Sequence, residues 1–179
     1  MTGVEPDGPT HDGRYLVVDG RRWRASDPGI PERLRAELVA ELMAARRAVR
    51  DGRGDPDGVA AARNRVQDAK VALGERGEPW WDEASRDGRD VRLAAVMRSL
   101  LGHRDPGSTI CPSDAARVVA GDRFRAVMED ARRVAAGLRH VGVVVTTQKG
   151  ADVDPEGARG PIRIGRGTHW DDRHSSSGR

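Results

Sequence analysis

The most reactive side chain of this sequence is its single cysteine, Cys111, which directly precedes Pro112 in the segment TICPSDAARVVAG. This position is a predicted helix start, where a thiol can be activated by the helix dipole. A nucleophilic thiol also needs a base, and the nearest histidines in sequence are His103 and His140. No CxxC or HxxxH spacing accompanies these residues, so we predict no metal site and no cofactor. We expect Cys111 to pack as a small apolar side chain, and an enzyme that uses its thiol is the weakest alternative.

Basic residues offer a second kind of chemistry, because they can neutralise the phosphates of a nucleic acid. Residues 89–179 contain 16 basic and 11 acidic side chains, whereas residues 1–88 contain 15 and 17. The basic excess therefore lies in the C-terminal half, and we look for contacts with a polyanion there.

Arginines at intervals of seven residues in the predicted helix 122–142 would form one line beside its apolar stripe. We predict that this line, the preceding helix and a loop near residue 149 contact double-stranded DNA. The predicted DNA-binding residues are Arg117, Arg125, Arg132, Arg139 and Lys149. The alternative is an ordinary solvated surface, since Glu129 lies four residues from both Arg125 and Arg133.

The elements that must position these residues follow from periodicity and turn signals. An apolar helix over 90–103 is followed by a short extended segment, a helix over 112–120 with Pro112 at its first position, and the long helix 122–142. The run VVVTTQK and the run IRI are β-branched and strand-like. This order is typical of a winged helix-turn-helix, which we place at residues 90–165, with residues 166–179 as a disordered tail.

The sequence of the N-terminal half predicts a β-hairpin and a helical hairpin, which we place at residues 13–81. A disordered segment, 1–12, precedes them, and a linker, 82–89, follows. YLVVDGRRWR predicts a hairpin with a two-residue Asp-Gly turn. Two apolar stripes then predict antiparallel helices, but both are narrow and rich in alanine. Trp80 and Trp81 either cap this helical hairpin or bind a partner, which could be a protein or a second copy of the chain.

Two stretches resemble known bacterial families. The run TICPSDAARVVAG together with FRAVMEDARRVAAGLRHVGVVVTTQKGADVDPEGARGPIRI resembles a domain-of-unknown-function family with a winged-helix-like fold, over about residues 90–165. VVDGRRWRASDPGIPE and AKVALGERGEPWW, over about residues 12–81, resemble short bacterial proteins labelled Tol-type biopolymer transporter. The first resemblance implies a winged helix, and winged helices bind DNA or other proteins.

Composition excludes other classes of protein. One cysteine cannot form an internal disulfide framework, and no apolar run approaches the roughly 20 residues needed to cross a membrane. The polar, acidic start is unlike a signal peptide, so we expect a cytoplasmic protein without membrane contact. The predicted function is that of a non-enzymatic, DNA-binding accessory or regulatory factor. The main alternative is a protein-interaction adaptor that does not contact nucleic acid.

Overall fold

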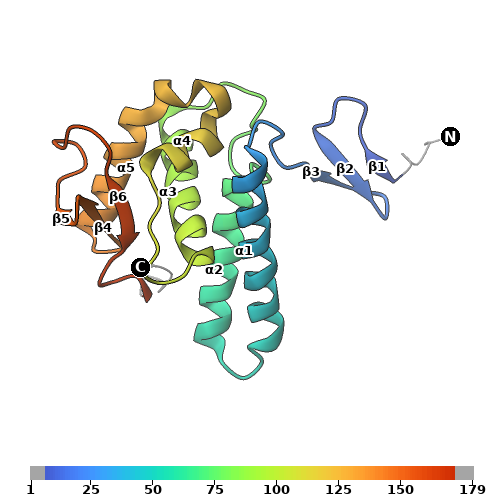
Figure 1. Ribbon diagram of the computed structural model, residues 1–179. Helices are drawn as coiled ribbons and strands as arrows, with labels where there is room; N and C mark the ends of the chain where they lie inside the picture. Colours follow the sequence, from blue (N-terminus) through green and yellow to red (C-terminus); the bar gives the residue numbers. More distant parts are fainter. Residues whose placement is uncertain (1–6, 172–179) are drawn as a thin grey trace.

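The computed structural model describes residues 7–171 of the chain. They form helices and two small antiparallel sheets (Figure 1), which confirms the predicted mostly α architecture with small β elements. The strands are β1 (Gly8–Pro9), β2 (Tyr15–Val18), β3 (Arg21–Arg24), β4 (Val144–Gln148), β5 (Ala151–Asp152) and β6 (Arg163–Arg166). The helices are α1 (Glu32–Asp51), α2 (Pro56–Ala72), α3 (Arg86–His103), α4 (Pro112–Ala120), the 3-10 helix η1 (Gly121–Val127) and α5 (Met128–His140). Within the described residues, no helix is long and apolar enough to span a bilayer.

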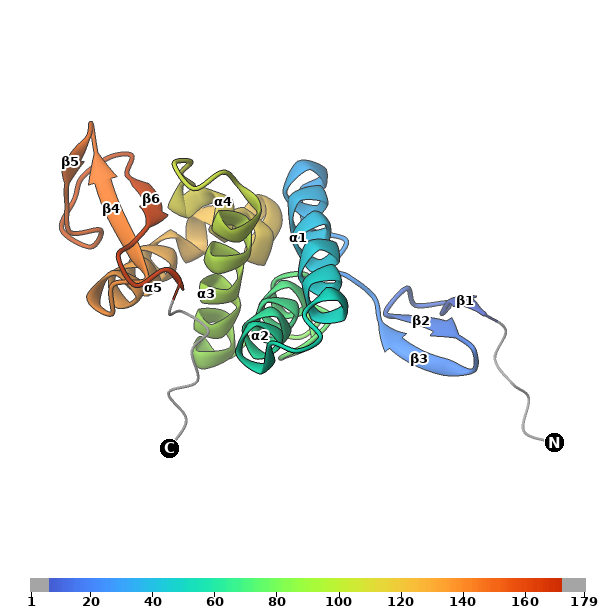
Figure 2. The ribbon, with the colours of Figure 1, turned by 90° about the horizontal axis from the view of Figure 1, so that it is seen from below.

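The first sheet has the strand order β1-β2-β3 and lies to one side of the helices (Figures 1 and 2). Its β2–β3 connection confirms the predicted two-residue turn, because Asp19 and Gly20 have φ angles of 51° and 70°. β1 comes from a segment that the sequence predicts to be disordered, yet it pairs with β2. Residues 1–6 of that predicted segment lie outside the described residues.

The helices α1 and α2 form the predicted helical hairpin, and the predicted apolar face of α1 buries Leu34, Leu38, Leu42 and Ala45. The side chain of Asp55 caps α2 by accepting a hydrogen bond from a backbone N–H in the first turn. Pro56 occupies the first helical position, where its missing N–H costs nothing. The two helices lie side by side along most of their length (Figure 1).

The apolar surface that this helical hairpin lacks is supplied by α3, which packs against both α1 and α2. Leu93, Val96, Met97 and Leu100 of α3 are completely buried. On its other sides α3 contacts α4 and α5, so the buried side chains of the two halves form one continuous cluster. Trp80 and Trp81 are not members of this buried cluster.

The start of α3 differs from the sequence prediction of a linker over 82–89 followed by a helix over 90–103. The helix begins at Arg86, because the hydroxyl of Ser85 accepts a hydrogen bond from the Gly88 N–H. The carboxylate of Glu78 in turn accepts hydrogen bonds from the N–H and the hydroxyl of Ser85. These hydroxyl and N–H donors hold the pKa of Glu78 below its ordinary value.

Three arginines of the α3 segment bind acidic residues of the N-terminal half. Arg98 makes a bidentate ion pair with Asp68 of α2, with N–O distances of 2.7 and 2.8 Å. Arg92 donates to Asp27 at 2.8 Å, and Arg104 donates to Glu37 of α1 at 2.7 Å. Such bidentate and charge-assisted contacts fix orientation as well as distance. They hold the two halves in one arrangement around the shared core.

The second sheet has the strand order β5-β4-β6 and packs beside α5 (Figure 1). Ile110, in the connection between α3 and α4, forms an antiparallel bridge with Ile164 of β6 through two backbone hydrogen bonds of 2.9 and 2.8 Å. Ile110, one extended residue shortly before α4, therefore pairs with β6, the last strand of the sheet. Both isoleucines are completely buried, so this bridge also belongs to the core.

The segment after β6 differs from the predicted tail, which begins at residue 166. Trp170 is only 5% exposed and belongs to the core cluster, and Arg166 lies against its ring, 5.1 Å from the ring centroid. The backbone N–H groups of Gly167 and His169 donate to carbonyls of the turn that follows α5. Residues 172–179 of the predicted tail lie outside the described residues.

Candidate functional site

The segment after α4 differs from the predicted single helix over 122–142. Gly121, with φ of 53°, ends α4, and η1 follows before α5 begins at Met128. Arg125 therefore lies on η1 and does not continue a line with Arg132 and Arg139 on α5. The predicted line assumed one continuous α-helix with about 3.6 residues per turn. The chain instead breaks at Gly121 and continues in tighter 3-10 turns, so residues seven positions apart no longer lie on one side.

Two predicted DNA-binding residues come together around one aromatic ring. The guanidinium carbons of Arg117 on α4 and Arg125 on η1 lie 3.9 and 4.9 Å from the ring centroid of Phe124. Both arginines are exposed, and neither has an acidic partner within the described residues. A cation stacked on an aromatic face keeps its charge available to solvent. The ring of Phe124 thus holds both guanidinium groups in place, and no carboxylate within the described residues neutralises their charge.

Arg132 has a different environment, because its guanidinium points into the loop between β5 and β6. It donates hydrogen bonds of 2.8, 2.9 and 2.5 Å to the backbone carbonyls of Pro155, Ala158 and Gly160. These contacts tie the loop to α5. The guanidinium of Arg132 is therefore occupied by the protein itself.

The remaining arginines of α5 are paired with carboxylates. Arg139 forms an ion pair with Asp152 of β5, and Arg133 binds both Asp90 of α3 and Asp130. Asp130 also accepts a hydrogen bond of 2.9 Å from Arg89. The hydrogen bond from Arg133, followed by that from Arg89, holds the pKa of Asp130 below its ordinary value although partial burial opposes this. The arginines of α5 therefore bind carbonyl and carboxylate groups of the protein itself.

Unpaired cations instead lie before and after α5. Lys149 occupies the tight turn between β4 and β5, with φ of 52°, and is exposed. Arg123 on η1, Arg159 in the loop and Arg163 on β6 are also exposed. Within residues 7–171 none of these four side chains makes an ion pair or hydrogen bond. Sequence reasoning missed the three arginines. A signal was present for two of them, because no acidic residue lies three or four residues from Arg123, and Arg163 pairs across the sheet with Thr147.

Trp80 and Trp81, the predicted partner-binding residues, attach the first sheet to the helices. The indole N–H of Trp80 donates to the carbonyl of Ala25 at 3.0 Å. Trp81 lies 5.5 Å from the ring of Tyr15 and 5.1 Å from that of Trp80, between centroids. The guanidinium of Arg24 lies 5.6 Å from the Trp81 ring centroid. Both tryptophans are half-buried by these contacts.

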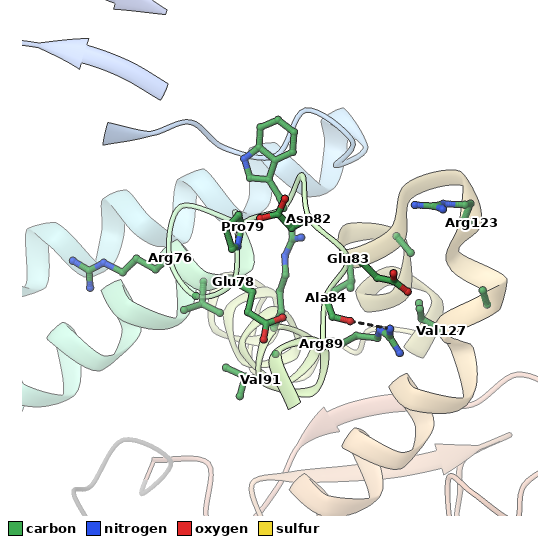
Figure 3. Close-up of a pocket in the computed structure, with 18 residues that line it drawn as sticks. Arg76, Glu78, Pro79, Asp82, Glu83, Ala84, Arg89, Val91, Arg123 and Val127 are labelled. Carbon is green, nitrogen blue, oxygen red and sulfur yellow. Dashed lines mark hydrogen bonds between the residues drawn. The ribbon is translucent and has the colours of Figure 1, made fainter. Parts of the chain in front are cut away.

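A cavity of about 510 Å³ lies between the 76–84 loop, the start of α3 and the α4–η1 turn (Figure 3). Val91, Val119 and Val127 contribute apolar walls. Arg89, at the base of the loop, donates to the carbonyl of Ala84, and this bond is drawn in Figure 3. The other charged groups that line the cavity are Arg76, Glu78, Asp82, Glu83, Arg92 and Arg123. Because both carboxylates and guanidinium groups line the cavity, it does not favour ligands of one charge.

Cys111 caps the start of α4 through its backbone, where its N–H donates to the carboxylate of Asp114 at 3.1 Å. Its side chain is half-buried. In the part of the chain that the structure describes, no hydrogen bond joins Cys111 to His103 or His140. The same residues contain no cluster of three potential metal ligands.

Comparison with known protein families gives a match in the C-terminal half. Residues 90–167 match the model of a family described as "Protein of unknown function (DUF3253)". The predicted resemblance to a domain-of-unknown-function family is confirmed over these residues. No curated protein matches the chain. The resemblance of residues 12–81 to Tol-type proteins stays a prediction.

Proposed function

We propose that residues 86–167 form a winged helix-turn-helix that binds the phosphate backbone of double-stranded DNA. The order of elements supports the fold: α3, the bridging residue Ile110, α4, α5, β4 and β6 follow one another as helix, strand, helix, helix, strand, strand. The bridge between Ile110 and Ile164 supports it further, because it sets the first strand position beside the last strand. The β4–β5 hairpin and the loop before β6 would form the wing.

The observation that carries the proposed function is the distribution of unpaired cations. In helix-turn-helix proteins, the second helix lies in the major groove with its N-terminal end toward the bases. In this chain that helix is α5, and the exposed Arg123 and Arg125 lie in η1 directly before it. Neither of them makes an ion pair or hydrogen bond within residues 7–171. Lys149 lies in the wing that follows α5, and Arg163 lies at the start of β6, directly after the wing. These cations would neutralise phosphates on both sides of the groove that α5 occupies.

The surface of α5 itself favours binding without strong sequence preference. Its exposed residues are Glu129, Gly137 and His140, and the helix contains no asparagine or glutamine. Its three arginines donate to protein carbonyls and carboxylates. Bidentate base recognition normally uses arginine, lysine, asparagine or glutamine in the groove. We therefore expect phosphate contacts to dominate the affinity.

The test is fluorescence anisotropy of a dye-labelled duplex titrated with the full chain at several salt concentrations. The variant combines Arg123→Ala and Arg125→Ala, and the matched control combines Arg46→Ala and Arg47→Ala, two exposed arginines of α1. The wild type and the control should share one log-log salt slope. The η1 variant should bind more weakly, with a slope smaller by roughly 2, since each lost phosphate contact removes about 0.9.

Two results would contradict this proposal. One is an absence of duplex binding by the wild type at low salt. The other is an equal loss of affinity in the α1 control, which would mean that only net charge matters. Circular dichroism of each variant checks that exposed-residue substitutions leave the fold intact.

A further inference from the structure

The cavity between the 76–84 loop, α3 and η1 is large enough for a small molecule and has apolar walls (Figure 3). Its volume of about 510 Å³ lies within the roughly 300–1,000 Å³ of ordinary ligand sites. Val91 of α3, Val119 of α4 and Val127 of η1 contribute apolar surface from three elements. Val91 is 57% exposed, and Trp80 also lines the cavity. These side chains offer apolar surface for the body of a ligand.

The loop beside this cavity is fixed by hydrogen bonds along its length. The carbonyls of Gly77 and Ala84 accept hydrogen bonds from arginine side chains at 2.8 and 3.4 Å. The indole N–H of Trp80 donates at 3.0 Å to the backbone between β3 and α1. The carboxylate of Glu78 accepts two hydrogen bonds from Ser85, at 2.8 and 2.6 Å. A loop held at both ends and in its middle keeps the cavity open, so the cavity is formed before any ligand binds.

Most of the charged side chains that line the cavity already have partners in the protein. The partnered pairs are Arg76 with Gln67, Glu78 with Ser85, Arg89 with Asp130, and Arg92 with Asp27.

Three charged side chains of the lining remain for a ligand. Asp82 and Glu83 of the loop and Arg123 of η1 are exposed. Their side chains make no hydrogen bond or ion pair within residues 7–171. Figure 3 shows Glu83 on the loop side of the cavity and Arg123 on the η1 side. The cavity therefore presents two carboxylates on one wall and one guanidinium on another.

We propose that this cavity binds a short apolar peptide, about two or three residues long, whose amine and carboxylate are both free. Its ammonium group pairs with Asp82 and Glu83, its carboxylate pairs with Arg123, and its apolar side chains pack on the valines of the wall. An extended peptide of that length spans roughly 7–11 Å, which fits a cavity of about 510 Å³.

A peptide fits this arrangement of charges better than other small ligands do. A ligand with one charge pairs with one wall only. A free amino acid carries both charges on one carbon, whereas here the carboxylates and the guanidinium lie on two different elements. This site does not depend on DNA binding, although Arg123 also belongs to the proposed DNA interface.

The experiment titrates the isotope-labelled full chain, without DNA, with the dipeptides Leu-Phe, Val-Leu and Ile-Trp and follows backbone amide chemical shifts. We expect binding, with shifts concentrated at residues 76–84 and 119–127. The tightest dipeptide is then compared with its N-acetylated form, its C-terminal amide and Gly-Gly. Each blocked form should bind about two- to fivefold more weakly, because each loses one exposed ion pair. Gly-Gly should not bind measurably, because it has no apolar side chain to bury.

Variants of the chain assign each preference to its residues. Arg123→Ala should bind the free dipeptide and its amide equally, because the group that recognises the carboxylate is gone. The combined variant Asp82→Asn and Glu83→Gln should bind the free and the N-acetylated dipeptide equally. The matched control is Arg86→Ala, an exposed arginine at the start of α3 that does not line the cavity. It should keep both preferences of the wild type.

The proposal is overturned if none of the three dipeptides shifts these amides, if the blocked forms bind the wild type as tightly as the free dipeptide, or if Arg123→Ala keeps the preference for a free carboxylate. Free phenylalanine that binds as tightly as the dipeptides would also overturn it, in favour of an amino-acid site. All substituted side chains are exposed, and circular dichroism checks that each variant is folded. Because DNA is absent, none of these outcomes depends on duplex binding.

Discussion

Replacing Arg132 with alanine tests whether this arginine is a structural residue or a phosphate contact. Its guanidinium makes three hydrogen bonds to carbonyls of residues 155–160, all between 2.5 and 2.9 Å. The substitution removes all three and leaves the loop between β5 and β6 without its attachment to α5. Arg125→Ala is the matched control, because Arg125 is exposed, stacks on the ring of Phe124 and makes no hydrogen bond or ion pair within residues 7–171.

The expected loss of unfolding free energy depends on how well water can replace Arg132 at the three carbonyls. A hydrogen bond from a charged donor contributes about 1.5–3 kcal/mol when its acceptor is shielded from water. Pro155 is buried, whereas Ala158 is half-buried and Gly160 is exposed, so water can replace part of what the latter two lose. We expect Arg132→Ala to lower the free energy of unfolding by about 2–3 kcal/mol, and Arg125→Ala by about 0.5 kcal/mol or less.

Urea unfolding followed by circular dichroism measures both values. The midpoint of Arg132→Ala should fall while the slope with denaturant stays that of the wild type, since the surface exposed on unfolding is unchanged. Equal midpoints for the wild type and Arg132→Ala would refute the reasoning. So would a loss in Arg125→Ala as large as that in Arg132→Ala.

Two further predictions concern the core and the ion pairs that Asp130 of α5 makes with Arg133 and Arg89. Leu100→Ala, at a completely buried position of α3, should lower the free energy of unfolding by about 2–5 kcal/mol in one cooperative transition; two separate transitions would contradict a shared core. Asp130→Asn should cost about 1 kcal/mol near pH 7. Because the folded state lowers the pKa of Asp130, its stabilisation is present above the unfolded pKa of about 4 and is lost as pH falls below it. The difference between wild type and Asp130→Asn in urea titrations should therefore shrink below about pH 4, and a difference that grows there would contradict the assigned ion pair.

Local structure was predictable where it depends on neighbouring residues. The turn at Asp19 and Gly20 follows from the left-handed conformation that this dipeptide adopts readily. The apolar stripe of α1 follows from helical spacing, and the start of α4 at Pro112 from the chemistry of helix starts. These features need no information about distant parts of the chain.

Features that depend on distant contacts were not predictable in the same way. The narrow stripes of α1 and α2 indicate missing apolar surface, but nothing local shows that α3 supplies it. Arg132 looks like a surface cation in the sequence, whereas its acceptors lie 23–28 residues away, in a loop with no regular pattern. Trp170 follows a polar stretch, yet its burial depends on the turn after α5. Each of these environments exists only after the chain has folded.

The central claim is that duplex DNA binds where η1 and the wing flank α5. The most direct measurement is a titration of the isotope-labelled full chain with a short duplex, followed by backbone amide chemical shifts. We predict shifts concentrated at residues 121–130 and 147–150, which weaken as salt is raised. Unchanged spectra at low salt, or shifts confined to the first sheet and α1, would contradict the proposed function.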